Sequence, residues 1–244
     1  MTTDAIILGS GRSKRMQGTD KLLANLDGNP VITWSIRAFE DNAAIRSVVI
    51  TTSTENDQKI RNFLRSSHFS KIHSIVAGGP CRARSVLNAL KALEDRPPDF
   101  VAVHDGARPL LTQKIILNGL DQLKVHPAAI PALPATDTVK ILDQHQRIMR
   151  SIPRSTVWHA QTPQFARYKD ILNAHLVQSD DLESFTDDAS LLEASGIPIQ
   201  AYQGDPENLK ITTAQDLATA STIVERRHED PSTATSTPKQ KKPQ

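Results

Sequence analysis

The sequence predicts an α/β fold: a three-layer, mostly parallel, Rossmann-like sheet with a protruding β-arm. Two observations support this prediction. Short runs of aliphatic and β-branched residues recur along the chain, and helical patterns fill the segments between them. Strands separated by helices pair in parallel through right-handed crossovers, which places helices on both faces of the sheet. Of the 244 residues, 38% are hydrophobic and only 4% aromatic, so we expect a core of aliphatic side chains.

The elements are expected in alternation along the chain. Buried strands are predicted at residues 5–8, 47–52, 72–76, 100–104 and 128–131, and helices at 31–40, 57–65, 82–93 and 112–123. In the segment 82–93, for example, Val86, Leu90 and Leu93 fall on one helical face. A final helix is expected to begin after Thr213, a good N-cap residue because Asp216 follows three positions later.

Residues 133–157 break this alternation. They contain polar and β-branched residues, no helical period, and prolines at positions 134 and 153. A long excursion inside a compact domain is unusual unless it has a function. We therefore expect a hairpin-like arm that reaches toward a second subunit; the alternative is a surface loop without regular structure. The arm belongs to one domain over residues 1–226, and the Pro/Ser/Thr/Lys-rich segment 227–244 is typical of a disordered tail.

Composition narrows the possible functions. The net charge is +2, but Lys239, Lys241 and Lys242 lie at the C-terminal end, and without them 26 basic residues stand against 27 acidic ones. The folded part therefore has no basic footprint for nucleic acid. No apolar run approaches the roughly 18 residues of a membrane-spanning helix. The single cysteine, Cys81, excludes an internal disulfide and a cysteine-rich metal site, and no signal or transit peptide is recognisable, so we expect a cytoplasmic protein.

The segment after the first predicted strand, residues 9–16, is rich in small and basic residues. In an open α/β sheet, ligands bind at the carboxyl ends of the strands, which is where this loop lies. Small residues let backbone N–H groups approach phosphate oxygens, and Lys14, Arg15 and Lys21 place three cations within eight positions. Neither the P-loop pattern nor the dinucleotide-binding glycine pattern fits. Alone, the loop is compatible both with phosphate binding and with a tight turn that carries solvated charges.

The opening pattern Gly11-x-Ser13-x-Arg15-Met16, followed by Lys21, resembles the signature of nucleotidyltransferases that activate sugars and polyols. Further segments follow in order: HDGARP at 104–109, DTVK at 137–140, WHAQTPQ at 158–164, TDDA at 186–189 and NLKIT at 208–212. Together, over residues 4–225, they resemble the 2-C-methyl-D-erythritol 4-phosphate cytidylyltransferase family. This resemblance implies transfer of a cytidylyl group from CTP to methylerythritol phosphate in non-mevalonate isoprenoid synthesis. It also implies Mg²⁺ bound mainly through the CTP phosphates, and a homodimer formed through the arm.

The resemblance implies roles for individual residues as well. The catalytic set comprises Arg15, Lys21, Arg154 and Lys210. The nucleotide-binding set comprises Gly9, Ser10, Gly11, Gly78, Gly79, Ser85, Asp105 and Gly106. The substrate-binding set comprises Asp105, Arg108, Thr138, Arg154, Thr162, Thr186 and Lys210, and Asp105 is also the candidate metal ligand. Thr138 and Arg154 lie on the arm, and in the resembling family such residues reach the acceptor phosphate of the neighbouring subunit.

Several residues also have plainer interpretations. His104 is expected to be an ordinary core histidine, because the acceptor phosphate is already ionised and the reaction needs no base. Asp187 and Asp188 are expected to form a solvated helix start rather than a metal-binding pair. Asp20 stands where proline is common in the family, and it either partly neutralises Lys21 or stiffens the loop.

The loop Pro80-Cys81 stands where the family usually has acidic residues, which leaves recognition of the nucleobase open. Three other functions compete with the one implied. A ribitol 5-phosphate cytidylyltransferase looks similar in the opening motifs, and a molybdenum-cofactor guanylyltransferase shares the first loop. A nucleotide-binding module without turnover would not require all four cations of the catalytic set.

Overall fold

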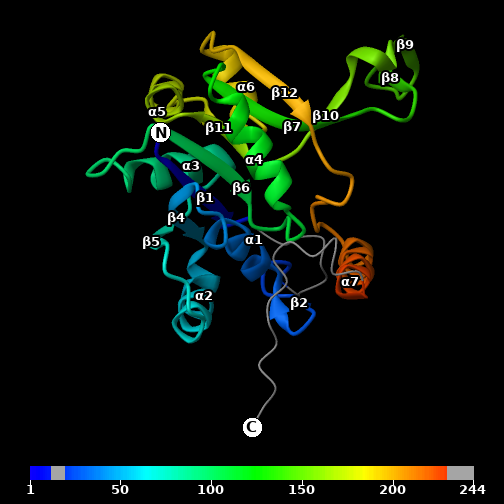
Figure 1. The fold of residues 1–244 in the computed structure, drawn as a ribbon. Helices are drawn as coiled ribbons and strands as arrows, with labels where there is room; N and C mark the ends of the chain where they lie inside the picture. Colours follow the sequence, from blue (N-terminus) through cyan, green and yellow to red (C-terminus); the bar gives the residue numbers. More distant parts are fainter. Residues whose placement is uncertain (12–19, 230–244) are drawn as a thin grey trace.

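The computed structural model describes residues 1–11 and 20–229, which fold around one large mixed sheet (Figure 1). Its strands follow the order β10-β7-β11-β6-β1-β4-β5, with β12 added beside β7. Neighbouring strands in one part of the sheet are all parallel: β1 (Thr3–Gly9), β4 (Ile45–Thr52), β5 (Ile72–Ala77) and β6 (Phe100–Asp105). This arrangement confirms the predicted α/β class, and each of these strands includes the run expected from the sequence.

Helices cover both faces of the sheet. In chain order these helices are α1 (Val31–Glu40), α2 (Thr54–Ser66), α3 (Arg82–Lys91), α4 (Gln113–Gln122), α5 (Tyr168–Val177) and α6 (Asp188–Ala194). Successive strand residues point to opposite sides of a sheet. Ile7 and Ile50 accordingly pack with α1, α2 and α4 on one face, while Ile6 and Val49 pack with α3, α5 and α6 on the other. The three predicted layers are therefore present.

One edge of the sheet differs from a simple parallel succession. β7 (Ala128–Pro134) does not pair with β6, because β11 (Gln164–Arg167) is inserted antiparallel between them. β10 (Trp158–Ala160) pairs antiparallel with β7, and β12 (Ile199–Gln203) pairs parallel with it. These short strands were not predicted, since strands of three to five residues carry little pattern of their own and find their register through distant partners.

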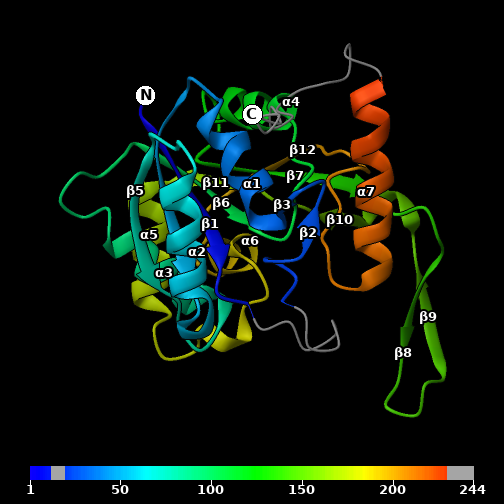
Figure 2. The same ribbon diagram turned by 90° about the horizontal axis from the view of Figure 1, so that it is seen from below.

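The predicted arm is a β-hairpin that projects from the body of the molecule (Figures 1 and 2). It consists of β8 (Val139–Leu142) and β9 (Ile148–Ile152), which form a separate two-stranded sheet. The turn between them is held by Asp143, whose carboxylate accepts from the backbone N–H groups of His145 and Arg147 at 2.9 Å. The structure thus confirms the hairpin and excludes a loop without regular structure.

The C-terminal helix α7 (Ala214–Glu229) packs beside α1 and the small hairpin of β2 (Asn25–Leu26) and β3 (Asn29–Pro30). Its expected start is confirmed. The Thr213 N–H donates to Asp216 Oδ2 at 2.8 Å, and the Asp216 N–H donates back to Thr213 Oγ1 at 3.3 Å. This reciprocal pair satisfies backbone donors that the first helical turn cannot satisfy itself.

Helix α7 continues to Glu229, three residues past the expected domain boundary at residue 226. The helix is held there by Arg227, whose Nη2 lies 2.9 Å from Glu207 Oε2. The rest of the predicted tail, residues 230–244, lies outside the described residues. Among the helices of the described part of the chain, none is long and apolar enough to cross a membrane.

Candidate active site

A pocket of about 350 Å³ opens at the carboxyl ends of β1 and β6. The sheet order reverses between these two strands, since β4 and β5 lie on one side of β1 and β6 on the other. Ligands of open α/β sheets bind at such a switch point. The residues that line the pocket are Leu8, Ser10, Gly11, Lys21, Leu22, Gly79, Pro80, Cys81, Arg82, Ser85, Asp105, Ala107 and Lys210.

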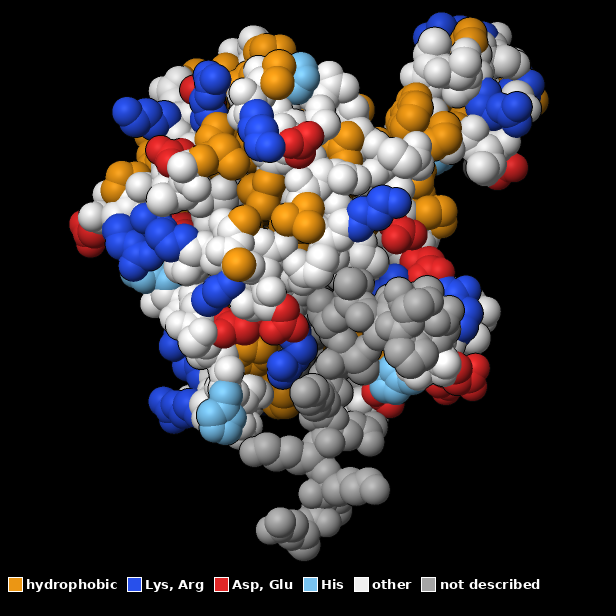
Figure 3. Space-filling view, in the orientation of Figure 1, with side chains coloured by type: hydrophobic (Ala, Val, Ile, Leu, Met, Phe, Trp, Pro, Cys, Tyr) orange, Lys and Arg blue, Asp and Glu red, His pale blue; other side chains and the backbone are white. Residues whose placement is uncertain are grey.

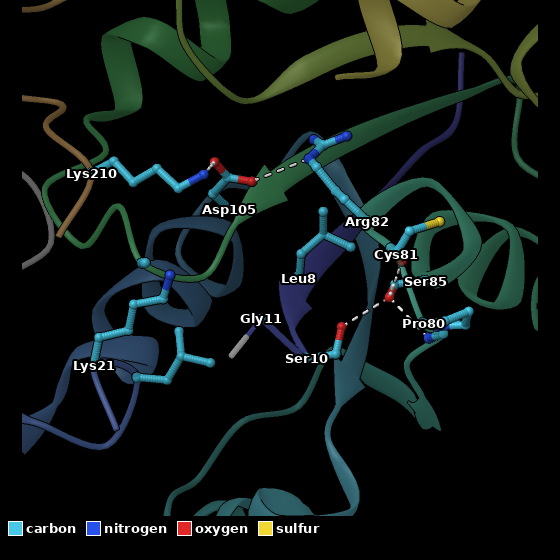
Figure 4. Close-up of a pocket in the computed structure, with 13 residues that line it drawn as sticks. Leu8, Ser10, Gly11, Lys21, Pro80, Cys81, Arg82, Ser85, Asp105 and Lys210 are labelled. Carbon is cyan, nitrogen blue, oxygen red and sulfur yellow. Dashed lines mark hydrogen bonds and ion pairs between the residues drawn. The ribbon is translucent and has the colours of Figure 1, made fainter. Parts of the chain in front are cut away.

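The lining has two chemically different halves (Figure 4). One half carries the charged side chains of Lys21, Arg82, Asp105 and Lys210. The other half is made by the hydroxyl groups of Ser10 and Ser85 and by neighbouring small or apolar residues. A ligand that is anionic at one end and uncharged at the other would match this division.

Asp105, the last residue of β6, is the centre of the charged half. Lys210 Nζ lies 2.8 Å from its Oδ2. The Nε atoms of Arg108 and Arg82 lie 3.7 Å from Oδ2 and 3.5 Å from Oδ1, respectively. Burial raises the pKa of Asp105, but the neighbouring cations, Arg82 foremost, outweigh burial and hold that pKa well below its usual value. Three positive charges thus surround Asp105. Because Arg82 also pairs with Asp188, one positive charge is in excess over the two carboxylates, and this excess attracts anions.

Arg82, the first residue of α3, was not among the residues predicted from the sequence. Its Nη2 lies 2.8 Å from Asp188 Oδ2, so the guanidinium bridges Asp188 and Asp105. Asp188 is only 1% exposed, so the expected solvated helix start is wrong for this residue. It fits Asp187, whose half-buried carboxylate caps α6 by accepting from the Ser190 N–H at 2.9 Å. A basic residue in the first turn of a helix opposes the helix dipole, and this is the signal that could have identified Arg82 as paired.

The backbone of Asp105 is held in place by Thr162. The Asp105 N–H donates to Thr162 Oγ1 at 3.1 Å, and that oxygen lies 3.0 Å from His104 Nδ1. Burial lowers the pKa of His104 to about 4, so the ring is neutral near pH 7. Its Nε2 then donates to the Arg108 carbonyl at 3.1 Å, and Nδ1 accepts from the Thr162 hydroxyl. The interpretation of His104 as a core histidine is confirmed, and Thr162 supports Asp105 from behind the pocket.

The segment that carries Lys21 is fixed by Asp20. The Leu22 N–H donates to Asp20 Oδ1 at 2.8 Å, and Asn56 Nδ2 donates to Asp20 Oδ2 at 2.6 Å. Of the two roles considered for Asp20, these contacts support stiffening of the loop. Lys21 itself points into the pocket from this segment (Figure 4).

Glycine is required at two positions behind the pocket. A Cβ on Gly9 would lie 2.5 Å from the carbonyl oxygen of Thr51, and a Cβ on Gly78 would lie 2.2 Å from Ser10 Cβ. Side chains at these positions would force the backbone apart. The missing side chain of Gly9 lets the end of β1 lie close to β4, and that of Gly78 lets the loops after β1 and β5 meet at the pocket.

The structure gathers part of the predicted set and leaves part of it elsewhere. The predicted residues that line the pocket are Ser10, Gly11, Lys21, Gly79, Ser85, Asp105 and Lys210. Those directly behind it are Gly9, Gly78, Gly106, Arg108 and Thr162. Thr138, Arg154 and Thr186 are exposed and do not line it, and Arg154 Nη1 instead donates to the Thr136 carbonyl at 2.8 Å. Arg15 lies outside the described residues.

A metal ion would depend on a substrate for most of its ligands. Asp105 is the one acidic side chain in the lining formed by the described residues. Across residues 1–11 and 20–229, no three His, Cys, Asp or Glu side chains gather into a group able to hold a metal. This donor set fits Mg²⁺, which commonly binds through one or two carboxylates together with substrate phosphates and water.

The model of one protein family, 2-C-methyl-D-erythritol 4-phosphate cytidylyltransferase, matches residues 3–226 of the chain. The chain belongs to that family. A member from Caldanaerobacter subterraneus subsp. tengcongensis is 35% identical over 90% of this chain and 97% of its own length. A member from Dictyoglomus thermophilum is 37% identical over 87% of this chain and 92% of its own length.

Solved structures agree with this assignment. The 4-diphosphocytidyl-2C-methyl-D-erythritol synthase of Anaerococcus prevotii has a TM-score of 0.82 at 26% identity, covering 92% of this chain and 99% of that one. The 2-C-methyl-D-erythritol 4-phosphate cytidylyltransferase of Francisella tularensis has a TM-score of 0.78 at 29% identity, covering 91% and 99%. The chain is therefore a cytidylyltransferase, and the family expected from its motifs is confirmed.

In this methylerythritol phosphate cytidylyltransferase, Pro80 and Cys81, in the loop before α3, line the pocket. Cys81 Sγ accepts from the Arg84 N–H at 3.4 Å and so caps α3, a task that an acidic side chain also performs well. Cys81 thus caps the helix without a charged side chain.

Proposed function

We propose that this chain transfers the cytidylyl group of CTP to 2-C-methyl-D-erythritol 4-phosphate and releases pyrophosphate, in the non-mevalonate synthesis of isoprenoid precursors. The observation that carries this proposal is the cluster of Arg82, Arg108 and Lys210 around Asp105, beside an uncharged half of the same pocket. The charged half suits phosphates and the uncharged half suits a nucleobase. Membership of the family supports the same reaction independently.

The reaction exchanges one phosphate bond for another. An oxygen of the acceptor phosphate bonds to the α-phosphorus of CTP, and the bond from that phosphorus to the oxygen bridging to the β-phosphate breaks. The bonding electron pair leaves with pyrophosphate. The acceptor oxygen is already ionised near pH 7, so no general base is required. Because both reactants are anions, the protein's tasks are to bring them together and to stabilise the negative charge that spreads in the transition state.

The cations divide these tasks between them. Lys21, together with Arg15, is proposed to hold the triphosphate. Lys210 is 39% exposed and paired with Asp105 at 2.8 Å, so it can exchange this partner for the phosphate of the acceptor. Mg²⁺, when bound, neutralises charge on the triphosphate, and Asp105 is the residue that would contribute a protein ligand.

A homodimer in which the arm completes the neighbouring site is part of the proposal. The arm carries exposed apolar side chains: Leu142 is 50% exposed, Ile148 65% and Met149 68%. Figure 3 shows hydrophobic side chains on the arm, which stands away from the body. Clustered exposed apolar residues mark interaction surfaces. Arg154, which does not line the pocket of its own chain, would act on the acceptor in the other subunit. We place the reaction in the cytoplasm, where CTP is available.

Release of pyrophosphate tests the proposed reaction. CTP, UTP, ATP and GTP are each offered with Mg²⁺ and with methylerythritol phosphate, ribitol 5-phosphate or no acceptor. We expect release only from CTP with methylerythritol phosphate. Turnover only with ribitol 5-phosphate would refute the acceptor, and no turnover with any pair would favour a nucleotide-binding module without catalysis.

Two lysine variants tie the activity to the pocket. Lys210→Met removes the cation paired with Asp105 and should lower kcat/KM at least about 100-fold. Lys124→Met is the matched control, because Lys124 forms an exposed pair with Asp121, and it should change kcat/KM by less than about twofold. Parental activity in Lys210→Met would show that the site lies elsewhere.

A further inference from the structure

We infer that Ser10 selects the nucleobase by accepting a hydrogen bond from an exocyclic amino group. This inference rests on the proposed function, because it assumes that the uncharged half of the pocket holds the base of the nucleotide. It gives the side chain of Ser10 a role in specificity, beyond the contact expected from the glycine-rich loop after β1.

Ser10 belongs to a chain of three hydroxyl groups. Its Oγ lies 2.9 Å from Ser85 Oγ and 3.3 Å from Thr51 Oγ1 (Figure 4 shows the contact with Ser85). Ser85 Oγ accepts from the Gly79 N–H at 2.9 Å. The same oxygen donates its proton to the Cys81 carbonyl at 3.0 Å. The hydroxyl chain therefore links β1, β4 and α3 at the wall of the pocket.

The direction of each hydrogen bond in this chain follows from the number of protons. A hydroxyl group has one proton and two lone pairs. Ser85 uses its proton on the Cys81 carbonyl, so Ser10 must be the donor to Ser85. The proton of Ser10 is then used, so Thr51 must be the donor to Ser10. The opposite direction would leave the proton of Thr51, which is fully buried, without an acceptor among the described residues.

Ser10 consequently offers the pocket a lone pair and no proton. One lone pair of its Oγ accepts from Thr51, and the second has no partner among the residues that the structure describes. Ser10 is half-buried and lines the pocket, so this lone pair is available to a ligand. Gly78 leaves room for this pair of hydroxyl groups, because a Cβ there would lie 2.4 Å from Ser10 Oγ and 3.2 Å from Ser85 Oγ.

An acceptor at this place discriminates between pyrimidines. Cytosine carries an amino group where uracil carries a carbonyl oxygen. The amino group donates to Ser10 Oγ, whereas the carbonyl would set its lone pairs against that of Ser10. A site built to accept from an N–H group rejects an analogue that lacks it, because a buried polar group is then left unpaired. Ser10 Oγ thus offers a side-chain acceptor in the half of the lining away from Asp105, the one carboxylate in the described lining.

Ser10→Ala tests the inference through nucleotide preference. Dissociation constants for CTP and UTP are measured by calorimetry without acceptor, and kcat/KM is measured for both nucleotides with methylerythritol phosphate. We expect the parent to prefer CTP. Ser10→Ala should lower the ratio of CTP to UTP affinity about tenfold, which is the effect of one hydrogen bond to an otherwise unpaired group.

A CTP analogue with hydrogen in place of the amino group makes the test sharper. In the parent, the analogue should bind about tenfold more weakly than CTP, and in Ser10→Ala the two should bind alike. Equal affinity of CTP and the analogue for the parent would by itself overturn the inference. This outcome needs no variant, so the inference can be refuted even where Ser10→Ala folds poorly.

Ser47→Ala is the matched control. Ser47 lies in β4, is 5% exposed, and its Oγ has no hydrogen-bond partner among the described residues. This variant should keep the parental preference for CTP. An unchanged preference in Ser10→Ala, or equal weakening of both nucleotides, would refute the role of Ser10 while leaving the proposed reaction intact. Failure of the parent to bind CTP would refute the proposed function and this inference with it.

Discussion

The pocket and the arm hold their charged residues in opposite ways. In the pocket, Asp105 is 8% exposed and is fixed by three cations and by the hydroxyl of Thr162. On the arm, Arg154 is exposed and bonds the Thr136 carbonyl at 2.8 Å. Preorganised charge is most effective where it needs no rearrangement during the reaction. The charged residues of the pocket are held by contacts within one chain. The residues of the arm are exposed, and their role depends on the molecule that binds the arm.

Asp105→Asn should have the largest effect, because it removes the central charge of the pocket and keeps its shape. Arg108 and Lys210 would lose their carboxylate partner, and Arg82 would keep only Asp188. We expect the free energy of unfolding to fall by about 3 kcal/mol and kcat/KM to fall at least about 100-fold. Urea unfolding and pyrophosphate release measure the two effects.

The matched control for that variant is Asp143→Asn on the arm. Asp143 holds the turn of the exposed hairpin, and asparagine keeps an oxygen that can accept the same hydrogen bonds. Its free energy of unfolding should change by less than about 1 kcal/mol. Similar losses in both variants would remove the distinction between an organised pocket and a peripheral arm.

Mixing two inactive variants tests whether the arm acts on a second subunit. Arg154→Ala should lower kcat/KM while leaving the affinity for CTP nearly unchanged, and Lys210→Ala should be inactive for lack of the pocket cation. After exchange of subunits, half of the dimers are mixed and each has one intact site, so about a quarter of the parental activity should return. Capture of untagged parent chains together with an affinity-tagged parent after the same mixing controls for exchange. No recovery despite exchange would place Arg154 and Lys210 in the same chain's site, and loss of CTP affinity in Arg154→Ala would show that the arm serves the nucleotide instead.

Acid should lower the free energy of unfolding through histidines buried in the body of the molecule, and not through residues of the arm. Burial lowers the pKa of His104 from 6.5 to about 4, and burial lowers the pKa of His175 as well. Between these pH values the unfolded chain binds more protons than the folded one, so the free energy of unfolding falls as pH falls. For His104 alone the loss from pH 6.5 to 5 should be about 2 kcal/mol, and it should level off below the folded pKa.

Urea unfolding at several pH values from 7 to 5 measures this slope. His104→Gln should reduce it, and His145→Gln, an exposed change at the turn of the arm, should keep the parental slope. A parental slope in His104→Gln would show that this histidine does not control acid stability.

Asp20→Ala should have the smallest effect of the variants considered. Its affinity for CTP shows whether the segment that carries Lys21 is held as rigidly as the rest of the pocket. The Leu22 N–H and Asn56 Nδ2 both lose their acceptor. We expect CTP to bind about three- to tenfold more weakly, by calorimetry. Asp121→Ala, at an exposed surface pair, is the control. Tighter binding of CTP by Asp20→Ala would mean instead that the carboxylate opposes the ligand through its charge.

The parallel part of the sheet was predictable because its strands are continuous aliphatic runs. Helix α1 was predicted with the bounds that the structure has, Val31–Glu40. The arm was predicted from the absence of a helical period. β11 was not predictable, since its four residues find their place by pairing with β6 and β7, which are remote in sequence. A strand or helix can therefore be predicted only where its own residues are numerous enough to show a clear hydrophobic pattern.

The residues of the site, like the strands, include some that were predictable from local sequence and some that were not. Lys21, Asp105 and Lys210 stand in short motifs, and the structure brings them to one pocket. The role of Arg82 depends on Asp188, which lies far along the chain and whose burial is not visible in a run of two acidic residues. The direction of the hydroxyl chain at Ser10 likewise depends on three separate elements. The sequence motifs thus identified the charged residues of the pocket. The contacts that hold those residues in place are made between distant parts of the chain and are not visible in the motifs.

The insertion of β11 has a consequence for synthesis of the chain. β6 ends at Asp105, but its edge is covered only when β11, beginning at Gln164, has been made. At about 5–20 residues per second, that edge stays bare for roughly 3–12 s on the ribosome. A bare, hydrophobic strand edge is a template for pairing with other chains. This edge is therefore a site for wrong pairing between nascent chains, and slow translation of residues 106–163 should lower the yield of folded enzyme without changing the finished molecule.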